Sequence, residues 1–214
     1  MDTRLLDEGF KLRRATPEDD RLIAGLVVEG FVDKFRPVFR GRLDRAAEVM
    51  ERWVALEHSI GGVTSLIVER ETDGGLSDPL ASIGVRTGHS DDEALSRKLW
   101  GTLREQLGLF PALRSATLLS HPRYNPIKTE AYVERLVVTN DYKRLGLARS
   151  LLYEAEALGR GAGKSSIGLH VSGINHEALA LYETEGYEET SRQSSWLTGY
   201  ALGIRDWIYL KKSL

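Results

Sequence analysis

The 214-residue sequence contains no cysteine, which removes a whole class of chemistry. Disulfide bonds, thiolate metal sites and cysteine nucleophiles are all excluded. Long apolar runs are missing too, as is a leader in which a charged stretch precedes an apolar one. We therefore expect neither membrane insertion nor secretion, and the sequence favours a cytoplasmic protein.

A large excess of charge of either sign is absent as well. The 29 Lys and Arg residues nearly balance the 31 Asp and Glu residues, and the formal net charge is −2. Proteins that hold nucleic acid through its phosphates usually present a basic field, so we expect no nucleic-acid partner. We also expect no metal, because His170 and His176 fall on successive elements without a third ligand at metal-site spacing.

One stretch resembles the loop that grips nucleotide phosphates: Gly159-Arg160-Gly161-Ala162-Gly163-Lys164-Ser165-Ser166. That loop requires the pattern G-x-x-x-x-G-K-[ST], but Leu158 occupies the position of the first glycine. Apolar residues recur at helical spacing before the stretch and alternate as in a strand after it. We therefore predict a helix-to-strand turn, in which glycines end the helix.

Helical and strand-like patterns alternate along the chain, which we interpret as one domain over residues 1–214. Strand patterns occur at residues 10–14, 64–69, 80–85, 131–139, 167–171 and 207–210. Helical patterns follow Thr16 and cover residues 44–57, 90–107 and 148–158. Strands interleaved with helices imply an α/β fold whose mixed sheet is covered on both faces.

Residues 86–129 depart from this alternation. The helix expected there ends at Gly108, and leucines recur in it at every fourth position from Leu95 to Leu107. Prolines at positions 111, 122 and 126 then predict a looped excursion before the next strand.

Residues 132–148 combine a strand, a short polar turn and a basic, glycine-containing turn that opens a helix. Unpaired N–H groups and the positive end of the helix dipole make a helix start suitable for an anion. Lys143, Arg144 and Arg149 add charge there, and the small Gly146 lets the backbone approach phosphates closely. The segment predicts a pyrophosphate site, although a solvated cationic helix start is the alternative.

This turn resembles the acyl-CoA-binding motif [QR]-x-x-G-x-[GA] of the GCN5-related N-acetyltransferase (GNAT) superfamily. Gly146 matches the motif and Ala148 is its permitted small residue, while Lys143 replaces the usual Gln or Arg but keeps a donor and a positive charge. Residues 175–187 resemble the family's N-x-x-A-x-x-L-Y-x-x-x-G-[FY] segment at every fixed position. The two motifs stand in the correct order and together cover about residues 131–190.

The resemblance implies a mixed, mostly antiparallel sheet of six to seven strands with helices on both faces and a helical insertion at residues 86–129. It also implies acetyl-CoA as co-substrate. The residues that it places at the coenzyme are Leu136, Val137, Val138, Lys143, Arg144, Leu145, Gly146, Leu147, Ala148, Arg149, Asn175 and Tyr182. For Asn175, capping of the helix that follows is a further role.

The implied reaction is direct attack of an amine on the acyl thioester. An alkyl amine with a pKa of about 10.4 is almost wholly protonated at pH 7, so a base is needed. Glu134 is the candidate base, directly or through a water, because it precedes Leu136 and Val138 by two and four residues and is expected on their face. Its alternative role is an ion pair across the sheet. Tyr182 is the candidate general acid, or alternatively an aromatic anchor.

The resemblance does not identify the acceptor. The family builds its acceptor pocket from the first helices and variable loops, here residues 31–42, 86–129 and 191–205. The acidic residues 91–93 offer a surface for a cationic acceptor, and the leucine stripe with Trp100 offers a homodimer contact. We expect acyl-CoA and an amine-bearing small molecule or peptide as partners. A non-catalytic acyl-CoA-binding or sensing module and a protein N-terminal or lysine acetyltransferase remain as alternatives.

Overall fold

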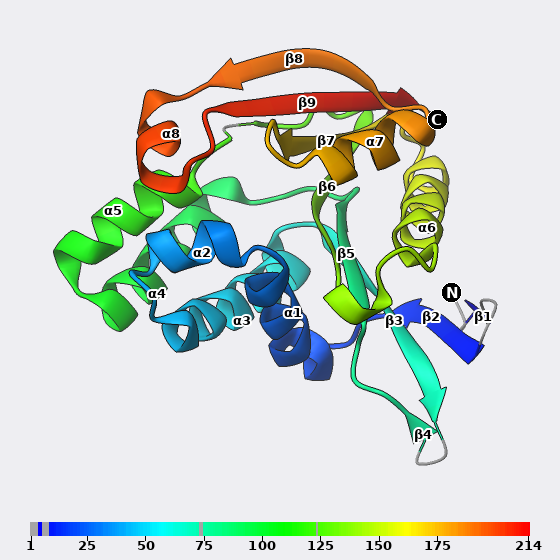
Figure 1. Cartoon of the computed structure of the whole chain (residues 1–214), viewed down its shortest axis with the longest axis horizontal. Helices are drawn as coiled ribbons and strands as arrows, with labels where there is room; N and C mark the ends of the chain where they lie inside the picture. Colours follow the sequence, from blue (N-terminus) through cyan, green and yellow to red (C-terminus); the bar gives the residue numbers. More distant parts are fainter. Residues whose placement is uncertain (1–3, 6–8, 73–74, 123) are drawn as a thin grey trace.

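A computed structural model of the chain describes residues 4–5, 9–72, 75–122 and 124–214. Its strands form one sheet in the order β1-β2-β3-β5-β6-β7-β9-β8, with β4 paired to β3 (Figure 1). Seven strands have five residues or more: β2 Phe10–Arg14, β3 Val63–Thr72, β5 Ala81–Arg86, β6 Glu130–Val138, β7 Ser166–Ser172, β8 Glu188–Ser194 and β9 Asp206–Ser213. The other two are β1 Arg4–Leu5 and β4 Gly75–Leu76.

The pairing confirms the predicted mostly antiparallel sheet. Strands β6 and β7 run parallel, and every other pair recorded for the described residues is antiparallel. The hairpin-like pairing of β3 with β5 follows the two strand patterns expected there.

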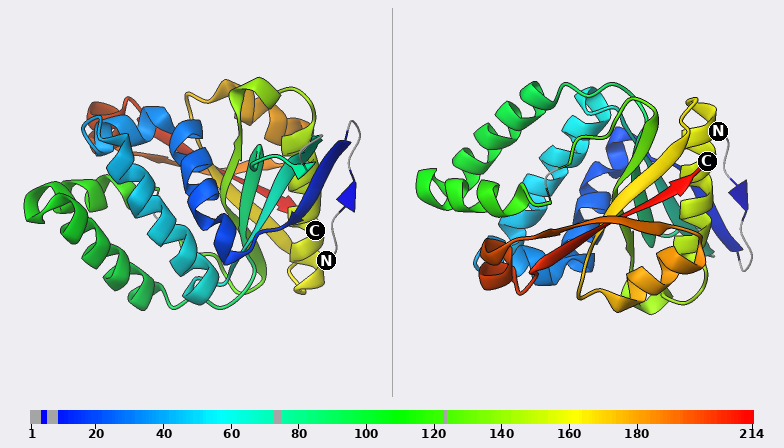
Figure 2. Two further views of the ribbon diagram at one scale, coloured as in Figure 1. Left: turned by 90° about the horizontal axis from the view of Figure 1, so that it is seen from below. Right: turned by 90° about the horizontal axis from the view of Figure 1, so that it is seen from above.

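Helices cover both faces of the sheet, as expected (Figure 2). The α-helices are α1 Asp20–Gly30, α2 Val32–Val38, α3 Leu43–Ile60, α4 Asp92–Leu107, α5 Leu109–Leu119, α6 Leu147–Gly161, α7 His176–Thr184 and α8 Trp196–Leu202. Two short 3₁₀ helices are η2 Pro17–Asp19 and η3 Asn140–Tyr142. Within the described ranges, no helix combines the length and apolar character needed to cross a membrane.

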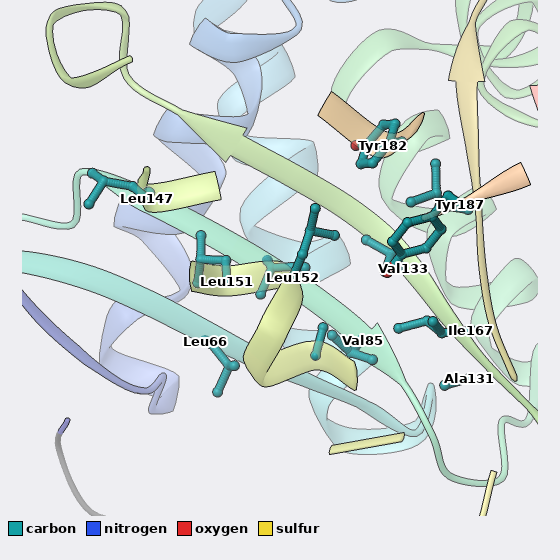
Figure 3. Close-up of a cluster of buried hydrophobic side chains, with 14 of the residues drawn as sticks. Leu66, Val85, Ala131, Val133, Leu147, Leu151, Leu152, Ile167, Tyr182 and Tyr187 are labelled. Atoms are coloured by element: carbon teal, nitrogen blue, oxygen red, sulfur yellow. The ribbon is translucent and has the colours of Figure 1, made fainter. Parts of the chain in front are cut away.

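Each face of the sheet has its own core. On one face, α6 buries Leu151 and Leu152 against strand residues such as Val133 and Ile167 (Figure 3). On the other face, α1, α2, α3 and α5 pack together with Trp207 of β9. The spacing of the buried residues of α6 is that of an amphipathic helix, which is why its core-facing stripe was readable in the sequence.

The glycine-rich stretch at residues 159–166 is confirmed as a helix-to-strand turn. Helix α6 ends at Gly161, and β7 begins at Ser166. Between them Gly163 has a φ of 70°, in the left-handed region that glycine adopts without steric cost.

The region between β5 and β6 contains a helix where the prolines predicted a loop. Helix α5 includes Pro111, but in its first turn, where the missing N–H removes no helical hydrogen bond. Helix α4 begins at Asp92, and its cap is the Asp91 side chain, which accepts a 2.9 Å hydrogen bond from the Ala94 N–H. Its leucine stripe packs within the chain, with Leu95 and Leu103 both buried.

Three elements of seven residues each were also missed. Helices α2 and α8 have seven residues each, too few for a helical period to stand out. Strand β8 is polar and largely exposed at the edge of the sheet, so it lacks the apolar alternation of a half-buried strand.

Candidate active site

Strands β6 and β7 pair over four residues and then separate. Their register runs from Glu130 opposite Ser166 to Val133 opposite Leu169. Strand β6 nevertheless continues to Val138, so its last residues have no recorded pairing with β7 in the described structure. The two strands therefore splay apart, and main-chain groups of β6 are left for another partner.

A cavity of about 500 Å³ opens at this splay. Strands β6 and β7 form one wall, and helices α1, α2, α3 and α7 supply others. Four residues predicted from the sequence line it together: Glu134, Lys143, Asn175 and Tyr182. Leu136 also lines the cavity, whereas Val137 and Leu147 are buried in the two cores.

The turn that opens α6 has the backbone of an anion site. Arg144 and Gly146 have φ values of 68° and 78°, both left-handed, and Gly146 is the N-cap of α6. No side chain caps this helix start among the described residues. The N–H groups of the first turn are therefore available to an anion, in the region of residues 145–149.

Two of the three cations at this turn already contact carboxylates. Nε of Arg149 lies 2.5 Å from a carboxylate oxygen of Glu185, and Arg144 lies 3.5 Å from Glu177. Lys143 is the cation of the turn that also lines the cavity.

Glu134 does not share the face of Leu136 and Val138, so that prediction is wrong. Val85 pairs with Val133 but Gly84 pairs with Arg135, so Glu134 is the extra residue of a β-bulge. The bulge turns Glu134 and Arg135 toward α3, while Leu136 and Val138 pack with the α6 core. A two-residue alternation cannot be carried across a bulge.

The Glu134 carboxylate faces Arg86 across β5 and β6. Its Oε1 lies 2.6 Å from Nε of Arg86, which is the cross-sheet ion pair considered as the alternative role. Burial and, to a smaller extent, the nearby Glu57 carboxylate raise the pKa of Glu134, while Arg86 and Arg135 lower it; the net result is a pKa of about 7. A carboxyl group with a pKa near neutrality is suited to accept a proton at physiological pH.

Tyr182 and Asn175 reach the cavity from α7. Tyr182 is buried, and its ring lies 5.8 Å from that of Tyr187 at an angle of 60° (Figure 3). Burial raises the pKa of Tyr182 well above its usual range, so the phenol keeps its proton. The Asn175 side chain caps α7 by accepting a 3.1 Å hydrogen bond from the Ala178 N–H, which confirms the capping role.

His170 is a cavity residue that the sequence prediction missed. Its Nδ1 lies 2.9 Å from the Tyr132 hydroxyl, and burial lowers its pKa to about 4, so the ring is neutral at pH 7. A single histidine in a strand pattern gives no signal of this position. His121 does not line the cavity; its Nδ1 lies 3.0 Å from the Thr117 carbonyl oxygen.

The region between β5 and β6 contacts the cavity through residues near its C-terminal end, not through its acidic N-terminal residues. Leu119 and Pro122 line the cavity. Asp91 caps α4, while Asp92 pairs with Arg86 and Glu93 pairs with Arg97. None of the three acidic residues 91–93 lines the cavity, and their role as a surface for a cationic acceptor stays a prediction.

Comparison with known proteins agrees with this architecture. The sequence model of the Acetyltransferase (GNAT) family matches residues 83–187. GCN5-related N-acetyltransferase 4, chloroplastic, from Arabidopsis thaliana is 36% identical over 70 residues, which are 31% of this chain and 24% of that relative.

Solved structures share the fold at low sequence identity. A GNAT-family protein from Desulfovibrio desulfuricans has a TM-score of 0.59 and 16% identity, with 95% of this chain and 98% of that chain covered. The ribosomal-protein-S18-alanine N-acetyltransferase of Escherichia coli has a TM-score of 0.53 and 15% identity, with 95% and 93% covered. The sequence model thus assigns residues 83–187 to the acetyltransferase (GNAT) family, and the solved structures show that the chain as a whole shares the fold.

Proposed function

We propose that this protein is an N-acyltransferase that moves an acetyl or other short acyl group from acyl-CoA to a primary amine by direct attack. The observation that carries the proposal is the single cavity lined by Glu134, Lys143, Asn175 and Tyr182. Its volume of about 500 Å³ is that of a small-molecule site. Members of the family use acetyl-CoA, which supports the choice of acyl donor.

The residues at the splay suit the coenzyme. The open first turn of α6, with Lys143 and residues 144–149, would hold the pyrophosphate. The unpaired edge of β6 over residues 136–138 would hydrogen-bond the amide-bearing arm. Asn175, which caps α7 and lines the cavity, would contact the same arm.

Glu134 and Tyr182 would move the two protons of the reaction. Glu134 would take a proton from the acceptor amine, directly or through a water, as the new C–N bond forms. Tyr182 would give its proton to the sulfur as the C–S bond breaks, leaving an amide and a free thiol. A phenol that is fully protonated at pH 7 and a carboxyl group near its pKa suit these opposite roles.

We further propose that residues 1–214 act as one domain, with residues 86–129 as a helical insertion that serves the acceptor side. Leu119 and Pro122 support this role because both line the cavity. The leucine stripe of α4 was the main argument for a homodimer. The buried leucines of α4 pack on their own chain, so the stripe no longer supports a dimer contact.

Thermal unfolding with and without ligand tests the binding step. Acetyl-CoA at about 100 times its dissociation constant should stabilise the fold by about 2.7 kcal/mol. Desulfo-CoA should do the same at saturation, and ATP should not. If protein free of co-purified CoA shows no shift with acetyl-CoA, the proposal is wrong.

Thiol release in a panel of small amines and peptides tests the transfer step. Turnover with a small amine supports the proposal, while exclusive turnover with peptides would favour a protein acetyltransferase. Binding of acetyl-CoA without turnover of any amine would leave a non-catalytic acyl-CoA-binding module.

A further inference from the structure

We propose that the preferred acceptor is an amine that also carries a carboxylate, and that Lys34 binds this carboxylate. The inference rests on the proposed transfer to an amine and adds the chemical class of the acceptor. It starts from a cation in the cavity that the transfer chemistry does not use.

Lys34 lies on α2 and lines the cavity. Its Nζ is 5.3 Å from the centroid of the Trp207 ring, and the nearest recorded hydrogen-bond acceptor is the His121 carbonyl oxygen at 3.5 Å. A carbonyl at that distance is a weak partner for an ammonium group. The side chain is thus held by an aromatic face while its donors stay largely unused.

The carboxylates deep in the same cavity are already paired with other cations. Glu57 pairs with Arg135 and Glu134 pairs with Arg86. Among the described residues, no carboxylate forms an ion pair with Lys34; Asp33, the preceding residue, lines the cavity but is exposed to solvent. A half-buried cation without a counter-ion is unfavourable, and a bound anion relieves that cost.

Burial lowers the pKa of Lys34 to about 8. The Lys34 ammonium group is therefore still protonated in most molecules at pH 7. Lys143 is the other lysine that lines the cavity, it has no ion pair within the described part of the chain, and it stands at the turn assigned to the pyrophosphate. Lys34 is therefore the cation left for the acceptor.

The cavity lining carries one group suited to each end of an amino acid. Glu134 on β6 suits the amine, and Lys34 on α2 suits the carboxylate. Phe31, Trp53 and Trp207 also line the cavity and provide apolar surface for the part between. A polyamine would instead bring a second ammonium group to Lys34, and like charges disfavour it.

Steady-state kinetics with matched acceptors tests the inference. Several α-, β- and γ-amino acids, each paired with its own carboxamide, would be compared as acceptors at saturating acetyl-CoA. The wild-type protein should prefer the carboxylate of the best pair by about tenfold or more in kcat/KM, the size of one charge-assisted contact. Lys34→Met should lose that preference because its KM for the carboxylate acceptor rises while kcat changes little. Lys34→Arg should keep part of the preference.

The melting-temperature increase with acetyl-CoA serves as the control, because it should be the same in wild type and Lys34→Met. Equal turnover of acid and amide by the wild type, or a preference that survives in Lys34→Met, would overturn the inference and leave the proposed transferase intact. Failure of all amines together with failure to bind acetyl-CoA would instead remove the proposed function, and the inference with it.

Discussion

Oε1 of Glu134, the extra residue of the β-bulge in β6, lies 2.6 Å from Nε of Arg86 on the neighbouring strand β5. The ion pair fixes the carboxylate at the cavity, yet burial still raises its pKa to about 7. Arg86 therefore positions Glu134 without lowering its basicity to that of an exposed carboxylate. The relationship makes the proposed base testable by pH.

Activity should depend on pH through Glu134. A general base works deprotonated, so kcat should fall as pH drops below about 7 and level off above it. Glu134→Gln should lower kcat by about 10²–10⁴-fold and remove this acidic limb of the pH profile, the fall of kcat below about pH 7. Rates measured from pH 5.5 to 8.5 with one acceptor check it, and an unchanged profile in the variant would assign the limb to another group.

Loss of the Tyr182 hydroxyl should slow transfer without disturbing the fold. Tyr182→Phe keeps the buried ring and should lower kcat by about 10²-fold or more if the phenol is the general acid. Tyr187→Phe is the matched control, because its ring is buried 5.8 Å away and does not line the cavity. Equal rates in the two variants would show that Tyr182 is only an aromatic anchor.

A methyl group at Gly146 should weaken coenzyme binding. Gly146 has a φ of 78°, so Gly146→Ala should cost about 1–2 kcal/mol of stability through backbone strain. Gly163→Ala imposes similar strain, since its φ is 70° and an added Cβ also meets open space. The melting-temperature increase with acetyl-CoA should shrink in Gly146→Ala and persist in Gly163→Ala; equal increases would argue against a pyrophosphate site at this turn.

The buried pair Glu57–Arg135 should be intolerant of losing one partner. Both side chains are about 5% exposed, so Arg135→Met leaves the Glu57 carboxylate without its ion pair. We expect a loss of about 3–5 kcal/mol in the free energy of unfolding. Urea titration measures the free energy of unfolding of Arg135→Met and of the double variant that also carries Glu57→Leu. The double variant should recover part of the loss. A double variant less stable than the single one would contradict the cause given.

Much of the site was predictable because its signals are local. The turn around Gly146 needs a left-handed residue and a helix start, and both are encoded within a few positions. The approximate ranges of α3, α6 and the central strands followed from periodicity, which burial of one face imposes on the sequence. Elements without such a period, α2, α8 and β8, were not found.

The face of Glu134 was not predictable in this way. A hypothetical Cβ on Gly84 would lie 2.8 Å from the Arg135 guanidinium, so the glycine makes room for that side chain beside the bulge. Gly84 and Arg135 stand far apart in the sequence, and nothing local relates them. The bulge therefore appears only when the strands are paired.

The sequence by itself determined the family resemblance, the order of the main elements and the turn around Lys143 and Gly146, because short-range backbone preferences and periodic burial are written locally. Tertiary structure alone decided which further side chains share the cavity and which face of the sheet Glu134 takes. Lys34, His170 and Glu134 come from α2, β7 and β6. Their meeting depends on strand register and on helices packing across the sheet, and those contacts join residues that no local pattern connects.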